Sequence, residues 1–318
     1  MKTITVVIPT YNEEENIPLV YERVVAIFRN ELKEYQYEIQ FIDNFSTDHS
    51  RKLILDLAQK DSHVRAIFNA KNFGFTRSTF YGLTQAEGDC AILLYADMQD
   101  PPEVIPEFVE RWEKGDKIVT GIKTSSKESP VMYFIRKCYY GIIKRISEID
   151  HIEQFDGFGL YDASFIKILR QLDDPYPYLR GIIAELGYQR SEVAYQQQKR
   201  EHGKTSFNFL RLYDQAMLGI TSYSKIVLRL ATMLGFAVAL VSIVIAVITF
   251  IYKLVNWNSF PVGLAAVSIG VFFFGAVQLF FIGFLGEYVL SINTRVLKRP
   301  LVIEERRINF PADQAQKK

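Results

Sequence analysis

The apolar positions of this chain follow one pattern over its first part and another near its C-terminus. Over residues 1–121, short runs rich in β-branched side chains alternate with stretches whose apolar positions recur at helical spacing. Strands are predicted at 4–8, 37–42, 64–68, 91–95 and 117–120, and helices at 14–32, 47–60, 76–86 and 102–113. Strands separated by helices of this length predict an α/β fold with a mostly parallel sheet covered on both faces.

Two long apolar stretches, 226–252 and 262–288, follow this region. Each exceeds the roughly 20 apolar residues that cross a hydrocarbon core, so we predict two transmembrane helices joined by a short link. A buried helical hairpin in a soluble core is the alternative. The flanking basic residues on the side of the first domain are Lys225, Arg229, Arg295, Lys298 and Arg299, whereas the link carries only Lys253. By the positive-inside rule, we expect a multi-pass protein of the cell membrane with both termini in the cytoplasm.

These patterns divide the chain into three predicted parts. Residues 1–224 form a cytoplasmic domain, residues 225–290 hold the two membrane helices, and residues 291–318 form a cytoplasmic tail, which is charged after Pro300 and which we expect to be partly disordered there. Amphipathic stretches near 131–147 and 206–224 are predicted to lie at the membrane interface, with a core-facing helix as the alternative for the first. The net charge of +1 gives no reason to expect a nucleic-acid partner, and glycines in both membrane helices are compatible with a homo-oligomer.

Polar residues follow four of the predicted strands. They are Pro9, Tyr11 and Glu13 after the first strand, Asp43 after the second, Asn72 after the third, and Asp97 and Gln99 after the fourth. Asparagine and aspartate are common in turns, so each position alone is weak evidence. Because parallel sheets bind ligands beyond the carboxyl ends of their strands, together these residues predict one crevice.

Asp97 and Gln99 are the candidate metal ligands. Two oxygen ligands two residues apart can share a hard cation, and Mg²⁺ or Mn²⁺ takes such ligands together with substrate phosphates. A structural turn closed by Asp97 is the alternative. The sequence has no phosphate-loop motif, no dinucleotide-binding glycine motif and no zinc-ligand spacing, which disfavours those classes of enzyme.

Three motifs resemble those of the family 2 glycosyltransferases. They are VVIPTYNEE at 6–14, DNFSTD at 43–48 and ADMQDPPE at 96–103. Within this family the chain is most similar to the polyprenyl-phosphate glycosyltransferases, the group of dolichol-phosphate mannose synthase and the bactoprenol glucosyltransferases. The resemblance covers nearly the whole chain. It implies a GT-A fold, Rossmann-like, that uses a nucleotide-activated sugar.

The expected reaction moves glucose from UDP-glucose onto polyprenyl (undecaprenyl) phosphate, with inversion, for cell-envelope glycosylation. GDP-mannose or another nucleotide sugar as donor is the alternative within the same chemistry. A non-catalytic membrane scaffold that binds nucleotide sugars is the alternative from another class.

The resemblance also implies roles for single residues. The donor nucleotide would contact Pro9, Tyr11, Glu13, Asp43, Asn72, Arg77 and Asp97, with the metal on Asp97 and Gln99. The acceptor phosphate would contact Arg136, Arg200 and Lys204, and Arg200 would also be catalytic by bringing two anions together. Asp156 would be the catalytic base or would position the sugar, with a helix-capping aspartate as the alternative.

This sequence departs from the family pattern at three positions. Tyr95 stands where many relatives have the first aspartate of Asp-x-Asp, so metal binding must depend on Asp97 and Gln99. Gly159 stands where relatives often have arginine, within what we interpret as a glycine-flanked turn that approaches the ligand. Ser206 stands where the family motif usually has a lysine after its threonine.

Overall fold

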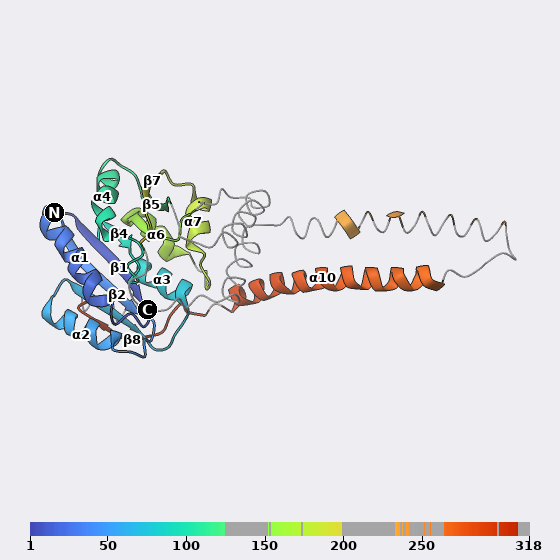
Figure 1. Cartoon of the computed structure of the whole chain (residues 1–318), viewed down its shortest axis with the longest axis horizontal. Coiled ribbons are helices and arrows are strands. Elements are labelled where there is room, and N and C mark those ends of the chain that lie inside the picture. The colour runs from blue at the N-terminus through green and yellow to red at the C-terminus, as the bar shows by residue number, and fades with distance from the viewer. Residues whose placement is uncertain are drawn as a thin grey trace.

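The structure, a computed structural model, describes residues 1–124, 152, 154–172, 174–198, 264–297 and 299–310, with isolated residues between 233 and 255. Its centre is an eight-stranded sheet in the order β7-β5-β6-β4-β1-β2-β3-β8. Helices lie along both sides of this sheet, and the long helix α10 extends away from it (Figure 1).

All five strands and four helices predicted for the first part of the chain are found. In chain order they are β1 (Thr3–Thr10), α1 (Ile17–Asn30), β2 (Gln36–Asp43), α2 (Ser50–Lys60), β3 (Val64–Asn69), α3 (Phe75–Thr84), β4 (Cys90–Leu93), the 3-10 turn η1 (Pro102–Val104) leading into α4 (Ile105–Glu113), and β5 (Ile118–Lys123). Strand β1 pairs in parallel with β2 and β4, and β2 with β3. This part of the prediction is confirmed.

Alternating side chains of the strands supply two separate cores. Val6, Ile8 and Ile92 pack with α1, α2 and α4 on one face of the sheet. Val7 and Leu93 pack on the other face with α3, α6 (Ala163–Gln171) and α7 (Leu179–Leu186). The sheet is therefore buried on both faces, which leaves its edges and strand ends for binding.

Two strands between residues 150 and 200 were not predicted. Strand β6 (Gly159–Asp162) lies antiparallel between β4 and β5, and β7 (Arg190–Tyr195) pairs in parallel with β5. The sheet is therefore mixed. Our interpretation of Gly159 as part of a turn that approaches a ligand is wrong, because Gly159 pairs with Leu93 and Thr120 inside the sheet.

Gly159 is required by the close approach of the neighbouring strand. A Cβ atom at this position would collide with the main-chain carbonyl oxygen of Val119, which cannot move without breaking the sheet. We expect Gly159→Ala to lower the free energy of unfolding by about 3 kcal/mol, as overpacking does in a rigid core. Denaturant unfolding measures this, with Gly275→Ala as control, because nothing lies within 4 Å of a Cβ there. Equal stability of the two variants would contradict the packing argument.

The C-terminal tail is part of the sheet domain. Strand β8 (Glu304–Ile308) pairs antiparallel with β3, and the Ala70 amide donates to the Ile303 carbonyl at 2.9 Å. The side chain of Asn309 donates to the carbonyls of Ala58 and Val64 at 2.7 and 2.8 Å. The expectation of disorder after Pro300 is therefore wrong for residues 301–310.

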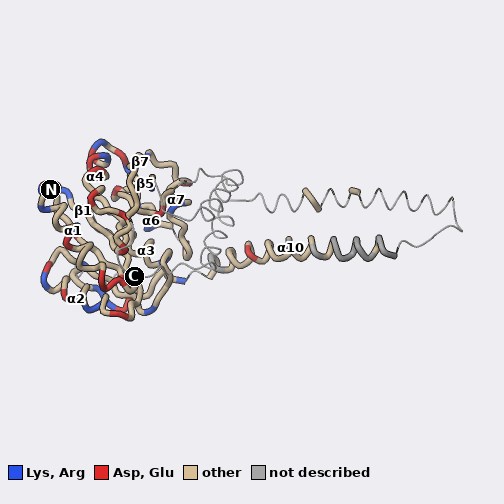
Figure 2. Tube along the Cα trace, viewed as in Figure 1, with Lys and Arg blue, Asp and Glu red and all other residues tan. Residues whose placement is uncertain are grey.

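Helix α10 (Leu264–Val296) is 33 residues long, and Glu287 and Arg295 are the charged residues in its sequence. Figure 2 shows that charged residues are concentrated on the sheet domain rather than along α10. Among the described residues, none of the helices meets the length and hydropathy required of a membrane span. The two-helix membrane hairpin and the interfacial helices near 131–147 and 206–224 stay predictions, since much of these segments lies outside the described residues.

Candidate active site

The loops at the carboxyl ends of β1, β2, β3 and β4 share an unusual backbone conformation. Asn12, Phe45 and Met98 have φ values of 56°, 67° and 58°, and Gly74 after β3 has a φ of 87°. For residues other than glycine this region costs about 1 kcal/mol or more, and it persists only where surrounding contacts enforce it. Strained residues after β1, β2 and β4, with a glycine turn after β3, mark this edge as a candidate ligand site.

Hydrogen bonds join these loops to one another. The Asn12 amide donates to Ser46 Oγ at 2.9 Å, and Asn12 Oδ1 accepts from the Thr47 amide at 2.8 Å. Asn44 Nδ2 donates to Asn72 Oδ1 at 3.0 Å, which ties the second loop to the third. These bonds connect the loops after β1, β2 and β3, and β4 is the neighbour of β1, about 4.8 Å away, so the predicted residues lie along one edge of the sheet.

The predicted base and ribose ligands sit in the first two loops. Pro9 is tolerated inside a central strand because β4 pairs with β1 only as far as Val7. Tyr11 is 38% exposed, and Glu13 Oε2 accepts from Asn16 Nδ2 at 2.6 Å. These positions leave the Tyr11 ring accessible to a ligand at the edge.

Asp43 is fully buried at the end of β2. Its carboxylate accepts hydrogen bonds from the amides of Phe45 and Ser46 at 3.2 Å, and Arg51 Nε lies 3.2 Å from its Oδ2. Burial raises the pKa of Asp43, although Ser46, Arg51 and Phe45 each favour the ionised form. Asp43 is thus held in one orientation by its own loop and by α2.

Two predicted donor residues follow β3: Asn72 lies in the loop, and Arg77 lies on α3. Asn72 Oδ1 accepts from the Gly74 amide at 2.9 Å as well as from Asn44, so it shapes the loop. Arg77 donates to the Pro300 carbonyl at 2.5 Å and lies over the Phe73 ring. Burial lowers the pKa of Arg77. Its described contacts are with Phe73 and the C-terminal segment, and its contact with a donor phosphate stays a prediction.

The turn after β4 carries the candidate metal ligands. Asp97 Oδ1 accepts from the Gln99 amide at 3.2 Å, so Asp97 does close a turn, and the carbonyl of Gln99 accepts from the Gln198 amide at 2.9 Å. A carboxylate has about four lone-pair sites, so a turn of this kind leaves room for a cation. Within the described part of the chain, no group of three or more metal-ligand side chains is found. A cation held by Asp97 and Gln99 would take substrate phosphate oxygens as further ligands, as Mg²⁺ commonly does.

A buried charge cluster lies beside this turn. Asp100 is 1% exposed and accepts from the Tyr195 hydroxyl at 2.5 Å. Lys123 Nζ lies 2.5 Å from Asp156 Oδ2 and 3.8 Å from Asp100 Oδ1. Burial, and next the negative charge of Asp156, raises the pKa of Asp100 to about 8. Burial alone would lower the pKa of Lys123, but Asp156 and Asp100 outweigh it and raise that pKa.

This cluster holds more negative than positive charge. Asp97 and Asp156 each act electrostatically on Asp100 and on Lys123, and Lys123 compensates only part of their negative charge. An added cation would relieve the remaining repulsion, and oxygen ligands are those that Mg²⁺ and Mn²⁺ prefer. The residues present therefore fit a divalent cation on Asp97 and Gln99.

Lys123 and Tyr195 were missed by the sequence analysis. The predicted fifth strand ended at residue 120, whereas β5 continues to Lys123. A predicted strand extended to residue 123 would have placed Lys123 at its carboxyl end, where the rule for parallel sheets looks for ligand-binding residues. Tyr195 ends β7, whose short half-exposed pattern gave no strand signal.

Asp156 precedes β6 rather than a helix. Its Oδ1 accepts from the Phe158 amide at 3.3 Å, and its carbonyl accepts from the Tyr95 hydroxyl at 2.8 Å. The helix-capping alternative is wrong, because Asp162 caps the next helix through the Ser164 amide. Tyr95, a departure from the family pattern, thus holds the backbone of Asp156. The remaining predicted site residues, Arg136, Arg200 and Lys204, lie outside the described residues.

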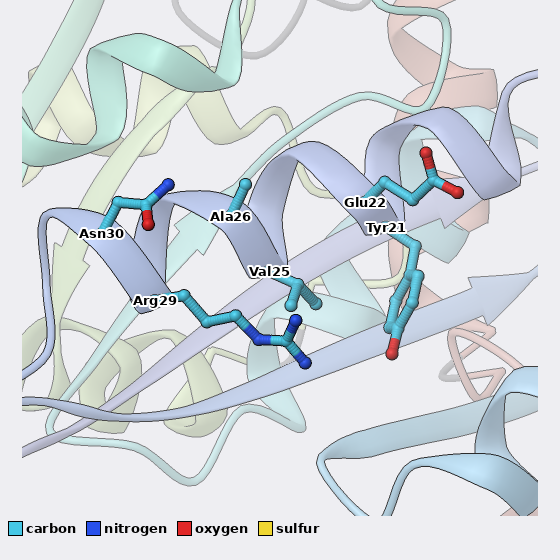
Figure 3. Close-up of a pocket in the computed structure, with 6 residues that line it drawn as sticks. All are labelled: Tyr21, Glu22, Val25, Ala26, Arg29 and Asn30. Carbon is cyan, nitrogen blue, oxygen red and sulfur yellow. The ribbon is translucent and has the colours of Figure 1, made fainter.

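One surface hollow lies away from this site. It is lined by Tyr21, Glu22, Val25, Ala26, Arg29 and Asn30, all on α1 (Figure 3). Helix α1 begins at the crevice and runs away from it at about 1.5 Å per residue, which puts Arg29 about 18 Å further along the helix than Ile17. The hollow is therefore not part of the candidate active site.

Comparison with known proteins gives the family. The signature described as "Glycosyl transferase family 2" matches residues 5–169. The SfII prophage-derived bactoprenol glucosyl transferase of Shigella flexneri is 34% identical over 302 residues, covering 94% of this chain and 96% of that protein. The prophage bactoprenol glucosyl transferase homolog of Escherichia coli K12 is 31% identical over 304 residues, covering 95% and 98%.

Solved structures show more distant likeness. A mannosyl-3-phosphoglycerate synthase from Rubrobacter xylanophilus matches with a TM-score of 0.48 at 13% identity, covering 74% of this chain and 75% of that one. Staphylococcus aureus TarS in complex with UDP-GlcNAc matches with a TM-score of 0.45 at 16% identity, covering 70% and 66%. The family assignment rests on the sequence relatives. The helix-flanked, Rossmann-like mixed sheet is the GT-A architecture, and the chain belongs to glycosyl transferase family 2 and is a glycosyltransferase.

Proposed function

We propose that this protein transfers glucose from UDP-glucose to polyprenyl phosphate at a membrane surface. The observation that carries the proposal is the similarity, over more than nine-tenths of both chains, to proteins named bactoprenol glucosyl transferase. Bactoprenol is a polyprenyl lipid, and the glucosyl group in these names indicates the sugar. The acidic strand-end cluster supports a donor that carries a diphosphate.

We place the protein in the cell membrane with the sheet domain in the cytoplasm. The apolar sequences 226–252 and 262–288 support two spans. Leu279, Ile282 and Leu285 of α10 are more than half exposed, as lipid-facing side chains would be. Strand β8 pairs with β3 of the sheet domain, so the chain after α10 returns to the side from which it left. An even number of crossings satisfies that constraint.

The reaction forms a bond between an acceptor phosphate oxygen and C1 of the sugar, and breaks the bond from C1 to the β-phosphate of UDP. Asp97 and Gln99 would hold a divalent cation, and that cation would neutralise charge on the leaving diphosphate. A phosphate monoester has a second pKa of about 6, so the acceptor is largely ionised at neutral pH. The enzyme therefore has little need of a general base.

Asp156 accordingly positions the sugar in this mechanism. Its carboxylate is paired with Lys123 at 2.5 Å, and its main chain is fixed by Tyr95. A carboxylate held in this way can accept a hydrogen bond from a sugar hydroxyl in a fixed direction. Lys123 and the predicted Arg200 and Lys204 would reduce the repulsion between the acceptor phosphate and the acidic cluster.

We expect Asp156→Ala to lower turnover about a hundredfold, because loss of a positioned charged group costs that much in comparable sites. Asp174→Ala, an aspartate whose carboxylate closes a local turn, is the control. Initial rates at saturating donor and lipid measure the effect. If Asp156→Ala kept near-full turnover in detergent, the proposed role of Asp156 in positioning the sugar would be wrong.

A donor panel tests the proposed function. Purified full-length protein is incubated with polyprenyl phosphate, Mg²⁺ and labelled UDP-glucose, UDP-GlcNAc, GDP-mannose or GDP-glucose. We expect a lipid-extractable product from UDP-glucose. Product from GDP-mannose instead would show that the donor is GDP-mannose and not UDP-glucose. Nucleotide binding without any lipid product would favour a non-catalytic sensor.

A further inference from the structure

The C-terminal strand is connected to the end of β2 through Arg51. Glu305 Oε2 on β8 accepts from Arg51 Nη2 at 2.7 Å. The Nε atom of the same guanidinium lies 3.2 Å from Asp43 Oδ2. One side chain of α2 therefore spans from the strand that follows α10 to the buried carboxylate at the end of β2.

The contact with Glu305 is the better aligned of the two. Arg51 Nε is buried and has no aligned hydrogen-bond partner, so its contact with Asp43 is electrostatic rather than directional. The guanidinium also lies over the rings of Phe45 and Phe68, at 5.6 and 5.1 Å from their centroids. The hydrogen bond to Glu305 is thus the directional contact that orients the Arg51 guanidinium over these rings.

We propose that Arg51 and Glu305 are positioning residues for nucleotide binding. Glu305 fixes the Arg51 guanidinium, and Arg51 in turn holds Asp43 ionised and oriented toward the donor. Because Asp43 is fully buried, its charged form depends on the few groups around it, and Arg51 is a cation among them. The inference rests on the proposed function insofar as that function assigns Asp43 to the nucleotide.

The same C-terminal segment is fastened on both sides of Glu305. Before it, the Pro300 carbonyl accepts from Arg77 on α3. After it, Arg307 Nη2 donates to Gln85 Oε1 at 2.6 Å at the far end of that helix. These contacts fix the strand rigidly against the sheet domain, so Glu305 is held in place to act on Arg51.

The expected effect is modest in size. The side chains of Glu305 and Arg51 are 44% and 22% exposed, so solvent screens their attraction. We expect Glu305→Gln to raise KM for UDP-glucose and Kd for UDP about three- to tenfold, as for a charge-assisted contact acting through one intermediary. KM for the lipid and kcat should stay unchanged, because neither residue is among those predicted to contact the acceptor. Tm should stay unchanged because solvent screens the pair.

The test uses the purified full-length protein and three variants. Glu305→Gln, Arg51→Lys and the double variant are assayed for both KM values, kcat and Tm, and for UDP binding with Mg²⁺ by calorimetry. Arg51→Lys keeps the charge, but a single ammonium cannot span two carboxylates. The matched control is Glu107→Gln, since Glu107 is 49% exposed and pairs with Arg111 on α4 at 3.6 Å.

The proposal predicts that the double variant is no worse than Arg51→Lys, because both changes break one chain of contacts. It is overturned if Glu305→Gln matches Glu107→Gln in UDP binding, if the two effects add, or if both KM values and Tm shift together. UDP binding does not require transfer. Wild-type protein that binds UDP without making glucosyl lipid would contradict the proposed function alone, whereas failure to bind UDP would overturn this inference as well.

Discussion

Asp97→Asn should lower glucosyl transfer about a thousandfold. The substitution removes the negative charge that, with Gln99, holds the cation on the leaving diphosphate, and electrostatic stabilisation of that kind is worth about 10²- to 10³-fold or about 3–4 kcal/mol. Initial rates with UDP-glucose and polyprenyl phosphate measure it. Tm should stay close to that of wild type, because the amide oxygen of the new side chain can still accept from the Gln99 backbone.

The control for this variant is Asp116→Asn, a partly exposed aspartate in the turn before β5. Chelation of divalent cations should reproduce the loss in wild-type protein, and Mg²⁺ or Mn²⁺ should restore activity. Asp97→Asn that retains more than a tenth of wild-type activity would show that the metal is not held here.

Lys123→Met should lower the free energy of unfolding by about 3 kcal/mol, as expected when a buried ion pair loses one partner. The change leaves Asp100 and Asp156 without their shared cation in a site where burial already disfavours charge. Chemical denaturation of the purified protein measures the effect, and transfer activity should fall too, because Asp156 loses its partner.

Lys117→Met provides the matched control. Lys117 pairs with Asp162 at 3.2 Å but is 47% exposed, so its loss should cost less than about 1 kcal/mol. Replacing Asp156 by Asn in the Lys123→Met protein should recover part of the stability, since the carboxylate that lost its partner at 2.5 Å is removed. Equal stability of the Lys123 and Lys117 variants would contradict the view of a buried charge cluster.

The first part of the fold was predictable because its signals are periodic. β1 to β4 are short apolar runs separated by helices with one apolar face, as α1 and α4 illustrate. The later strands gave weaker signals. β6 has four residues and includes a glycine whose place in the sheet depends on contact with Val119, which no local pattern reveals.

Strand β8 was missed for a different reason. Its sequence, EERRI, resembles a solvated charged tail. In the structure each charge has a partner from a distant segment or from the strand itself: Glu305 contacts Arg51, Arg306 lies over Phe68, and Arg307 contacts Gln85 and Glu304. Such tertiary pairing overrides local composition, so the sequence alone favoured disorder.

The candidate site was predictable where it follows strand ends. The rule for parallel sheets pointed to Asp43, Asn72 and Asp97, because each comes shortly after an apolar run. It could not find Arg51, because this residue lies on helix α2 and not at the end of a strand. It also could not find Tyr195, because β7 was not predicted. Lys123 was missed because strand boundaries are the least certain part of a sequence pattern.

The most direct test of this account is the position of Mn²⁺ in crystals grown with UDP-glucose. Anomalous scattering should locate the ion about 2.0–2.2 Å from the Asp97 carboxylate, with the diphosphate completing its coordination. The uracil and ribose should lie beside Tyr11 and Asp43. An ion bound elsewhere, or a nucleotide lodged away from the ends of β1, β2 and β4, would contradict the account.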